Sequence, residues 1–306
     1  MKLLCNLLFF SFGWSAPLVS AGFPDPKAIS EAWQSDVSEF SFVSYSVSGT
    51  LNNAKHPRLR LDWQEEDEKC LYSFEARNDD GGLNLSSTYS FDGERSLRMT
   101  DNDGLLIAQK APWPIPPWVK NVEFITAPYD FLFRREAKPL LNKMPSTLLK
   151  DPHVFKAFAE NSACVGFETR NGSECLVVRV NNTRDRFDDQ IETYYLIFLD
   201  VSKKFRPVGW QQFTIDGRLM AEFEQLTTEE VVAQNTKRLL TVPKSLKISY
   251  YNYKDKNSQK HLSNSWQFDF SNLVFDSSKA KEFSLDLTSA DTVYDQDENT
   301  WITIPK

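Results

Sequence analysis

The acidic segment near the end of the chain has the spacing closest to that of a metal site. Asp295, Asp297 and Asn299 alternate as the first oxygen ligands of an EF-hand calcium loop do. The glycine that should follow is Thr300, and the twelfth position holds Lys306 in place of the bidentate glutamate. The segment is therefore predicted to be a solvated acidic stretch and not a calcium site.

Catalytic motifs are missing from the sequence. It contains no G-x-S-x-G, no H-E-x-x-H, no Walker loop and no G-x-G-x-x-G. Its three histidines, His56, His153 and His261, are scattered, and there is no C-x-x-C pair, so a zinc site is not expected. We therefore predict that the protein is not an enzyme, has no catalytic residue and needs no metal and no cofactor.

Three cysteines, Cys70, Cys164 and Cys175, follow the N-terminal segment, and an odd number leaves at least one free thiol. The Asn-Gly pair at 171–172 predicts a two-residue hairpin turn in which Glu168 faces Cys175. Cys164 would then lie four residues further along its strand, on the order of 13 Å away. A disulfide needs Cα atoms within about 7 Å, so unbonded thiols are favoured unless the loop is wider.

The first 21 residues have the pattern of a secretory signal peptide. Lys2 is a short positive region, residues 3–14 are mostly apolar, and Val19-Ser20-Ala21 offers small residues to a signal peptidase. The apolar run is shorter than the ~20 residues that cross a bilayer. Cleavage near Ala21 would leave residues 22–306 as an exported chain, periplasmic or extracellular, without a transmembrane segment.

The composition describes a folded, acidic protein. The net charge of −7 argues against a nucleic-acid partner, which usually requires a basic surface. Aromatic residues make up 13% of the chain and include 23 phenylalanines, so a large core or an apolar cavity must accommodate them. No Ser/Gly-rich linker divides the chain, and residues 22–306 are predicted to form a single domain.

Residues 26–39 are predicted to form the first helix. Asp25 can cap its N-terminus, and Pro26 suits the first helical position. Apolar side chains recur at helical spacing, at Ile29, Ala32, Trp33, Val37 and Phe40. A helix with one apolar face of this kind should cover an apolar surface elsewhere in the protein.

After this helix, apolar and polar residues alternate in one segment after another. The pattern begins at residues 59–63 and recurs in at least ten segments, the last of them at residues 266–270. Turn signals such as Asp92-Gly93 and Asp216-Gly217 separate the segments. One apolar and one polar face per strand is typical of an antiparallel sheet, so the predicted fold class is mainly β.

The middle of the chain interrupts this rhythm. Residues 111–118 read Ala-Pro-Trp-Pro-Ile-Pro-Pro-Trp, an extended segment that cannot join a central strand. A short helix is predicted at residues 128–136, and Asp151-Pro152 should cap another, with an apolar face formed by Val154, Phe155 and Phe158. This insertion is either a lid across an open barrel or a surface excursion, and the sequence leaves both open.

The predicted helix is followed by Tyr45-Ser46-Val47-Ser48-Gly49, by Tyr89-Ser90-Phe91-Asp92-Gly93 and, after the interruption, by Arg206-Pro207-Val208-Gly209-Trp210. This order resembles the bacterial periplasmic lipoprotein-carrier and lipoprotein-receptor superfamily, over nearly all of residues 22–306. The chain has a longer middle than the well-known carriers and no lipobox. The resemblance implies a single strongly curved antiparallel sheet, an unclosed β-barrel wrapping the N-terminal helix, with a short helical insertion in the middle. It also implies an apolar cavity for acyl chains.

Two functions from different classes remain open. The first is binding or carriage of a hydrophobic ligand, such as an acyl chain, a lipid or a lipidated protein. The second is a structural or interaction protein of the cell envelope whose barrel is filled by its own helix and aromatic side chains. Trp33 and Val37 of the helix are predicted to gate the cavity. Strand parity predicts the lining residues Leu61, Trp63, Tyr72, Phe74, Phe91, Met99, Phe167, Trp210 and Phe223.

Overall fold

The computed structural model describes residues 23–37, 42–66, 69–100, 105–110, 152–184, 191–233, 237–252, 261–275, 282–283, 285 and 291–304. The predicted signal peptide, the proline-rich segment at 111–118 and the helix predicted at 128–136 lie outside these residues.

Two α-helices, one short 3-10 helix and fifteen strands make up the described part of the chain. In chain order they are α1 (Pro26–Val37), β1 (Phe42–Leu51), β2 (Leu59–Glu66), β3 (Lys69–Arg77), β4 (Leu83–Phe91), β5 (Ser96–Thr100), β6 (Leu105–Gln109), α5 (Pro152–Asn161), β7 (Ser162–Arg170), β8 (Ser173–Arg184), β9 (Glu192–Asp200), η3 (Val201–Lys203), β10 (Arg206–Thr214), β11 (Leu219–Ala233), β12 (Arg238–Asn252), β13 (His261–Val274), β14 (Thr292–Asp295) and β15 (Thr300–Thr303). The predicted fold class, mainly β with few helices, is confirmed.

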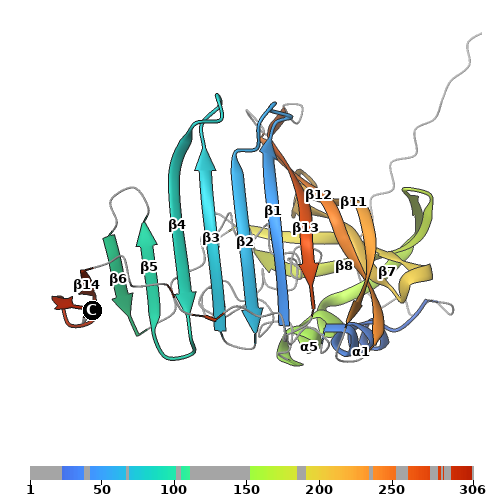
Figure 1. Cartoon of the computed structure of the whole chain (residues 1–306). Coiled ribbons are helices and arrows are strands. Elements are labelled where there is room, and N and C mark those ends of the chain that lie inside the picture. The colour runs from blue at the N-terminus through green and yellow to red at the C-terminus, as the bar shows by residue number, and fades with distance from the viewer. Residues whose placement is uncertain are drawn as a thin grey trace, which may run out of the picture.

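All fifteen strands belong to one sheet, in the order β15-β14-β6-β5-β4-β3-β2-β1-β13-β12-β11-β10-β9-β8-β7 (Figure 1). Neighbouring strands run antiparallel, except that β14 pairs in parallel with β6. The prediction of a wholly antiparallel sheet is therefore wrong at this edge. The physical reason is the connection: β14 follows β13 in the chain but lies beyond β6, so a long crossover joins them and a hairpin does not.

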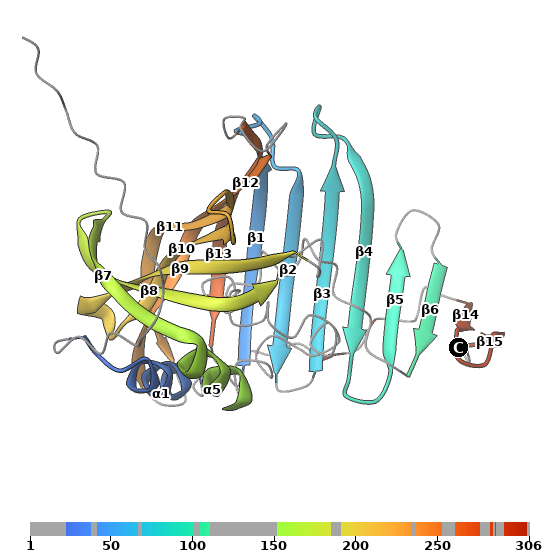
Figure 2. The ribbon, with the colours of Figure 1, turned by 180° about the vertical axis from the view of Figure 1, so that it is seen from behind.

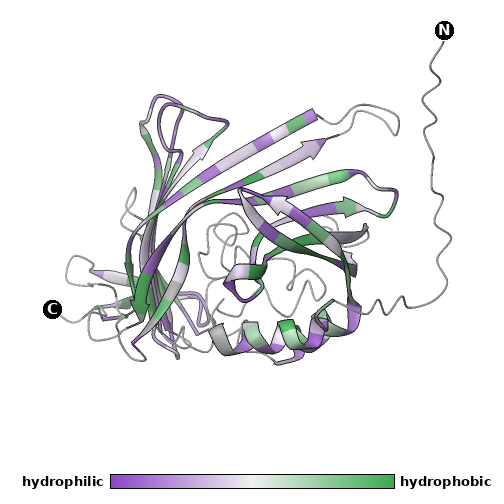
Figure 3. Ribbon diagram, turned by 90° about the vertical axis from the view of Figure 1, so that its right-hand side faces the viewer, coloured by the Kyte–Doolittle hydropathy of each residue, from purple (hydrophilic) through white to green (hydrophobic). Residues whose placement is uncertain are grey.

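The sheet changes direction along its length. Figures 1 and 2 show β8 and β9 running across the direction of β1 to β4, and Figure 3 shows the bend from the side. One hydrophobic cluster contains buried residues from β1 to β4, from β8 to β13 and from both α-helices. Strands that are far apart in the sheet order therefore contribute to a common core.

Strand β13 shows how alternation in sequence becomes two faces of the sheet. Phe268 and Phe270 are 3% and 4% exposed, whereas Asp269 between them is exposed. Their partners on β1 are Gly49 and Val47, and both phenylalanines belong to the main core cluster. The alternation predicted at residues 266–270 is thus confirmed for Phe268, Asp269 and Phe270.

The first helix begins as predicted. The Asp25 side chain accepts a hydrogen bond from the Lys27 backbone N–H at 2.9 Å, as an N-cap residue does. Ile29 and Trp33 are each 1% exposed, and the Trp33 ring lies 4.7 Å from that of Phe158 on α5. Residues 38 and 39 of the predicted helix lie outside the described residues, and α1 is seen to Val37.

The second helix, α5, also forms where capping and spacing predict it. Val154, Phe155 and Phe158 are buried and belong to the main core cluster, together with residues of α1 and β8. The two helices thus pack on each other and contribute their apolar sides to the same core as the sheet. In Figure 1 they lie next to each other at one end of the strands.

The hairpin of β7 and β8 has the predicted register. Arg170 pairs with Ser173 and Glu168 pairs with Cys175, and both turn residues have positive φ angles, 48° for Asn171 and 79° for Gly172. A two-residue turn of this hand matches the twist of the flanking strands. Cys164 is opposite Val178, so it lies away from Cys175, and all three cysteines of the described chain are unbonded.

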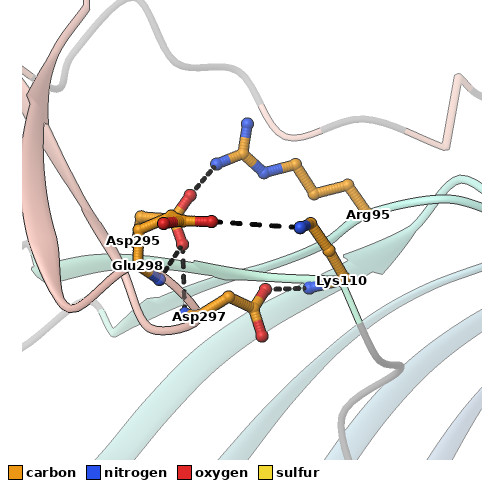
Figure 4. Close-up of polar contacts among 5 residues, drawn as sticks. All are labelled: Arg95, Lys110, Asp295, Asp297 and Glu298. Atoms are coloured by element: carbon orange, nitrogen blue, oxygen red, sulfur yellow. Dashed lines mark hydrogen bonds and ion pairs between the residues drawn. The ribbon is translucent and has the colours of Figure 1, made fainter.

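The acidic segment after β14 binds to the sheet edge (Figure 4). Asp295 accepts hydrogen bonds from the backbone N–H groups of Asp297 and Glu298, and from the Arg95 guanidinium at 2.8 Å. Asp297 accepts one from the Lys110 backbone N–H at 2.6 Å. Asp295 is only 9% exposed, so the segment predicted to be solvated is partly a buried contact between the C-terminal hairpin and β5–β6.

Candidate ligand-binding face

Cross-strand register determines which side chains share a face, because directly paired residues point to the same side of a sheet. By this rule Tyr45, Trp63, Tyr72, Tyr89 and Arg98 form one row across β1 to β5. We call the side of the sheet that carries this row the apolar face. Pairing through β13, β12 and β11 continues the same face as far as β10, β9 and β8.

Six of the nine predicted lining residues lie together on the apolar face and belong to the main core cluster. They come from β2 and β3 at one end of the core and from β10 and β11 at the other. Each is between 1% and 3% exposed: Leu61, Trp63, Tyr72, Phe74, Trp210 and Phe223. The structure therefore brings these six side chains together, from segments about 150 residues apart in the chain.

The other three predicted lining residues occupy different environments. Phe91 is on the apolar face, half-buried at the margin of the main cluster. Phe167, on the outermost strand β7, is 52% exposed and stacks on Phe23 at 5.4 Å. Met99 pairs with Thr88 and Leu106, which places it on the opposite face, in a second cluster with Leu106 and residues of the C-terminal segment.

The predicted gating residues are only partly described. Trp33 is buried, and its indole Nε1–H donates a hydrogen bond of 2.6 Å to the Phe205 carbonyl in the turn between β9 and β10. The side chain of Val37 lies outside the described residues. Trp33 therefore connects α1 to the sheet as well as to α5.

Three aromatic rings from the row of β2 to β4 stack in sequence, and we call them the aromatic ladder. Trp63 and Tyr72 lie 5.0 Å apart, and Tyr72 and Tyr89 lie 4.7 Å apart with an interplanar angle of 10°. The Arg98 guanidinium lies over the Tyr89 ring, 5.5 Å from its centroid. A cation over an aromatic face is attracted by the ring quadrupole, so a half-buried positive charge ends the ladder.

The apolar face also carries polar groups that sequence reasoning missed. Glu65 is 2% exposed and accepts a hydrogen bond from the Trp63 indole at 3.3 Å. The hydroxyls of Ser87 and Ser96 are buried without a hydrogen-bond partner, and both residues are 0% exposed. Their only signal in the sequence is strand parity, because they share a parity with Tyr89 and Arg98 respectively.

A pocket of about 150 Å³ is lined in part by Phe223, one of the predicted lining residues. Its lining combines the tip of the β7–β8 hairpin with the β9–β10 turn and part of β11, including Arg170, Asp200, Lys203 and Glu224. Three of these charged residues already have partners: Lys203 lies 3.8 Å from Asp200, and Glu224 accepts a hydrogen bond from the Asn171 side chain. This pocket is polar and is separate from the aromatic ladder.

Neither thiol chemistry nor a metal site emerges from the described residues. Burial raises the pKa of the Cys164 and Cys175 thiols, with Asp25 and Asp200 adding to the effect respectively, so both thiols are poor nucleophiles. Among the residues that the structure describes, no three His, Cys, Asp or Glu side chains are placed to hold a metal ion. No helix in that part of the chain is long and apolar enough to cross a membrane.

Solved structures with a similar arrangement have low sequence identity. A DUF1329 family protein from Desulfovibrio piger is 8% identical, with a TM-score of 0.46 over 84% of this chain and 96% of that one. An outer-membrane lipoprotein-sorting protein domain from Vibrio parahaemolyticus is 11% identical, with a TM-score of 0.44 over 85% and 96% of the two chains. A LolA superfamily protein from Nitrosomonas europaea is 11% identical, with a TM-score of 0.40 over 82% and 93%.

Lipoprotein-sorting and LolA superfamily structures are thus among those this chain is similar to. No protein-family model matches the sequence. No curated protein matches it either.

Proposed function

We propose that this protein binds or carries a hydrophobic ligand, such as an acyl chain, a lipid or a lipidated protein, on the apolar face. The observation that carries the proposal is the continuity of that face: one buried apolar cluster extends from β2 and β3 through β13 to β8. In this proposal the sheet is a strongly curved, unclosed barrel, and α1 and α5 occupy its interior.

The physical basis is the gain from burying an acyl chain, about 0.8 kcal/mol for each methylene group. Six of the predicted lining residues on the face are already 1% to 3% exposed, so a ligand must replace existing contacts. The helices are the natural candidates for displacement, because Trp33 contacts Phe158 and the Phe205 carbonyl and neither contact belongs to the sheet ladder. A ligand therefore binds when the free energy gained by burying it exceeds the free energy of the helix contacts that it displaces.

The wider biological setting belongs to the same proposal. Residues 22–306 form one exported domain after cleavage near Ala21, periplasmic or extracellular, with envelope proteins as further partners. Strand β1, near the start of the described chain, lies beside β13, near its end, in the same sheet. This pairing supports a single domain. Ligand binding proceeds without catalysis.

The test is a titration of the purified protein with a fluorescent fatty acid, together with native mass spectrometry of protein isolated from its own host. Saturable binding with micromolar or tighter affinity, and a co-purified lipid mass, are the expected results. Absence of both would contradict the proposal.

The second candidate is a structural or interaction protein of the cell envelope with a self-filled interior. The close burial of α1 and α5 favours it, because Trp33, Phe155 and Phe158 already fill space that a ligand would use. It predicts that no ligand protects the helices from hydrogen exchange or displaces them, whereas a carrier shows a ligand-dependent change in α1.

A further inference from the structure

We infer that the polar pocket at the tip of the β7–β8 hairpin binds a small zwitterion, an α-amino acid, with its carboxylate on Arg170 and Lys203 and its ammonium group on Glu224. The inference goes beyond the proposed function, because it assigns a second site that takes a different chemical class of ligand. Its starting point is the pocket of about 150 Å³ that these three residues line.

The pocket forms where β10 and β11 separate. The two strands pair only as far as Gly209 and Glu224, whereas β11 continues to Ala233 in pairing with β12. Among the described residues, residues 225–228 therefore have no strand beside them on the β10 side, and they line the pocket. An unpaired strand edge presents free N–H and C=O groups, so the backbone here adds hydrogen-bonding groups to the pocket.

Gly209 keeps one wall of the pocket free of a side chain. A Cβ atom here would lie 3.0 Å from the Phe223 carbonyl oxygen and 3.6 Å from Cδ2 of Phe198. Gly209 and Glu224 pair with each other and alternate with Trp210 and Phe223, which lie on the apolar face. The Glu224 carboxylate therefore lies on the other side of the sheet from the apolar face.

The two cations in the lining have unused hydrogen-bonding capacity. Arg170 donates from Nε to Glu168 at 3.1 Å, and its guanidinium lies over the Phe198 ring, 3.4 Å from the centroid. Within the described part of the chain its Nη1 and Nη2 atoms have no other partner, and these atoms can bind a carboxylate as a fork. The Lys203 Nζ lies 3.8 Å from Asp200, which is beyond hydrogen-bond distance. Both cations can therefore donate to a ligand carboxylate.

The charges of the lining determine which ligand fits. Arg170 and Lys203 are balanced by two carboxylates, Asp200 and Glu224, so the lining has no formal net charge. Asp200 is buried and already accepts two hydrogen bonds. Glu224 accepts one from Asn171 through Oε1, which leaves its Oε2 atom, among the described residues, open to a ligand donor. A ligand with one charge of each sign and no net charge matches these open groups.

The volume of the pocket determines the size of the ligand. An engineered cavity of about 150 Å³ holds one benzene molecule, which has six heavy atoms. Alanine also has six heavy atoms and carries a carboxylate and an ammonium group on neighbouring carbons. A small α-amino acid is therefore the ligand class that fits the charge and the volume together.

The experiment is a ligand-observed NMR titration of the purified protein at pH 6.5 with L-alanine, L-lactate and L-alaninamide, which are equal in their number of heavy atoms. At this pH alanine is a zwitterion, lactate is an anion and alaninamide is mainly a cation. Alanine should bind with millimolar or tighter affinity. Each of the other two should bind about tenfold more weakly, because it lacks one charge-assisted contact.

The variants test each contact with the ligand that lacks the matching charge. Arg170→Gln should weaken alanine binding about tenfold and leave alaninamide binding unchanged, since alaninamide has no carboxylate. Glu224→Gln should weaken alanine binding by a similar factor and leave lactate binding unchanged. Glu174→Gln and Lys204→Gln are the matched controls, because both residues are exposed and neither lines the pocket, and they should change no affinity. Circular dichroism of each variant checks that it is folded.

Four results would overturn the inference. Absence of saturable alanine binding well above millimolar concentration removes the site and leaves the proposed function untouched, because a fatty acid is titrated separately. Lactate binding as tight as that of alanine excludes the contact with the ammonium group, and equally tight alaninamide binding excludes the contact with the carboxylate. Loss of all three ligands in a folded Arg170→Gln variant shows that Arg170 shapes the pocket and does not bind the carboxylate.

Discussion

Gly49 on β1 leaves no room in the core for a side chain. A Cβ atom at this position would lie 2.8 Å from Cε1 of Phe268 and 3.2 Å from Cβ of Leu59. Both neighbours are buried in the main cluster, so neither can move aside without a cost. The absence of a side chain on β1 is what lets the Phe268 ring lie across the strand.

Gly49→Ala should therefore lower the free energy of unfolding by about 1–3 kcal/mol, as overpacking of a core does. Urea unfolding measures it. Gly166→Ala is the control, because a Cβ there meets nothing within 4 Å, and it should change stability by less than about 0.5 kcal/mol. Equal effects at the two sites would show that Phe268 does not cover β1 in this way.

Cys175 links a buried thiol to the pH dependence of stability. Burial, and then the Asp200 charge, raise its pKa above the ordinary value of 9.0, so the folded protein holds the thiol proton more tightly than the unfolded chain. The stabilising effect is complete below pH 9 and is lost as pH rises through the folded pKa.

Between pH 8 and pH 10 the wild type should therefore lose more stability than Cys175→Ala does, in paired urea melts under reducing conditions. The variant is the control for every other group that titrates in this range. Parallel pH profiles for the two proteins would mean that the thiol is ionised equally in both states.

Among the elements, the C-terminal hairpin is attached to the sheet in an unusual way. Strand β14 pairs with β6 through only two residue pairs, Tyr294–Ile107 and Asp295–Ala108. Leu285 and Val293 also pack with Leu106 and Ala108 of β6 in a small second hydrophobic cluster. So short a ladder gives little stability by itself. The Asp295 carboxylate, with its two backbone N–H groups and Arg95, should therefore carry much of the docking energy.

Asp295→Ala should destabilise this edge by about 1–2 kcal/mol, since it leaves two turn N–H groups without their acceptor and removes the ion pair. Hydrogen exchange should show faster exchange in residues 105–109 and 292–303 and no change in β1 or β2. Glu298→Gln, whose exposed pair with Lys110 spans 4.0 Å, is the control and should have no measurable effect. Uniform loss of protection across the sheet would contradict a local role.

At the scale of the whole molecule, the question is whether the helices fill the interior permanently or yield it to a ligand. Trp33 connects α1 to α5 by ring packing and to the β9–β10 turn by a hydrogen bond. Loosening α1 therefore tests the two candidate functions against each other.

Trp33→Ala should lower the free energy of unfolding by about 3–5 kcal/mol, because it truncates a buried aromatic side chain. It should also tighten the binding of a fluorescent fatty acid, since the ligand then displaces a weaker competitor. Trp33→Phe keeps a ring against Phe158 but loses the hydrogen bond to the Phe205 carbonyl. It should therefore change both the free energy of unfolding and the affinity for the fatty acid by less than Trp33→Ala does. Weaker binding by a folded Trp33→Ala variant would place Trp33 in the ligand site and not in competition with it.

Local patterns in the sequence were sufficient to predict several helices, strands and turns, and some contacts between residues on adjacent strands. The capped start of α1, the Asn-Gly turn that separates Cys164 from Cys175, and the alternation around Phe268 all depend on residues a few positions apart. Propensity and period act over this range, so such features can be read from one chain.

Only the tertiary structure decided which face each strand turns toward the core. In β5 the apolar residues Leu97 and Met99 suggested an inward face, but pairing with β4 puts Arg98 on the apolar face and Met99 on the other. Alternation shows which side chains share a face of their own strand, whereas the register with neighbouring strands determines which side of the sheet that is. For the same reason the burial of the Ser87 and Ser96 hydroxyls had no signal in the sequence beyond parity.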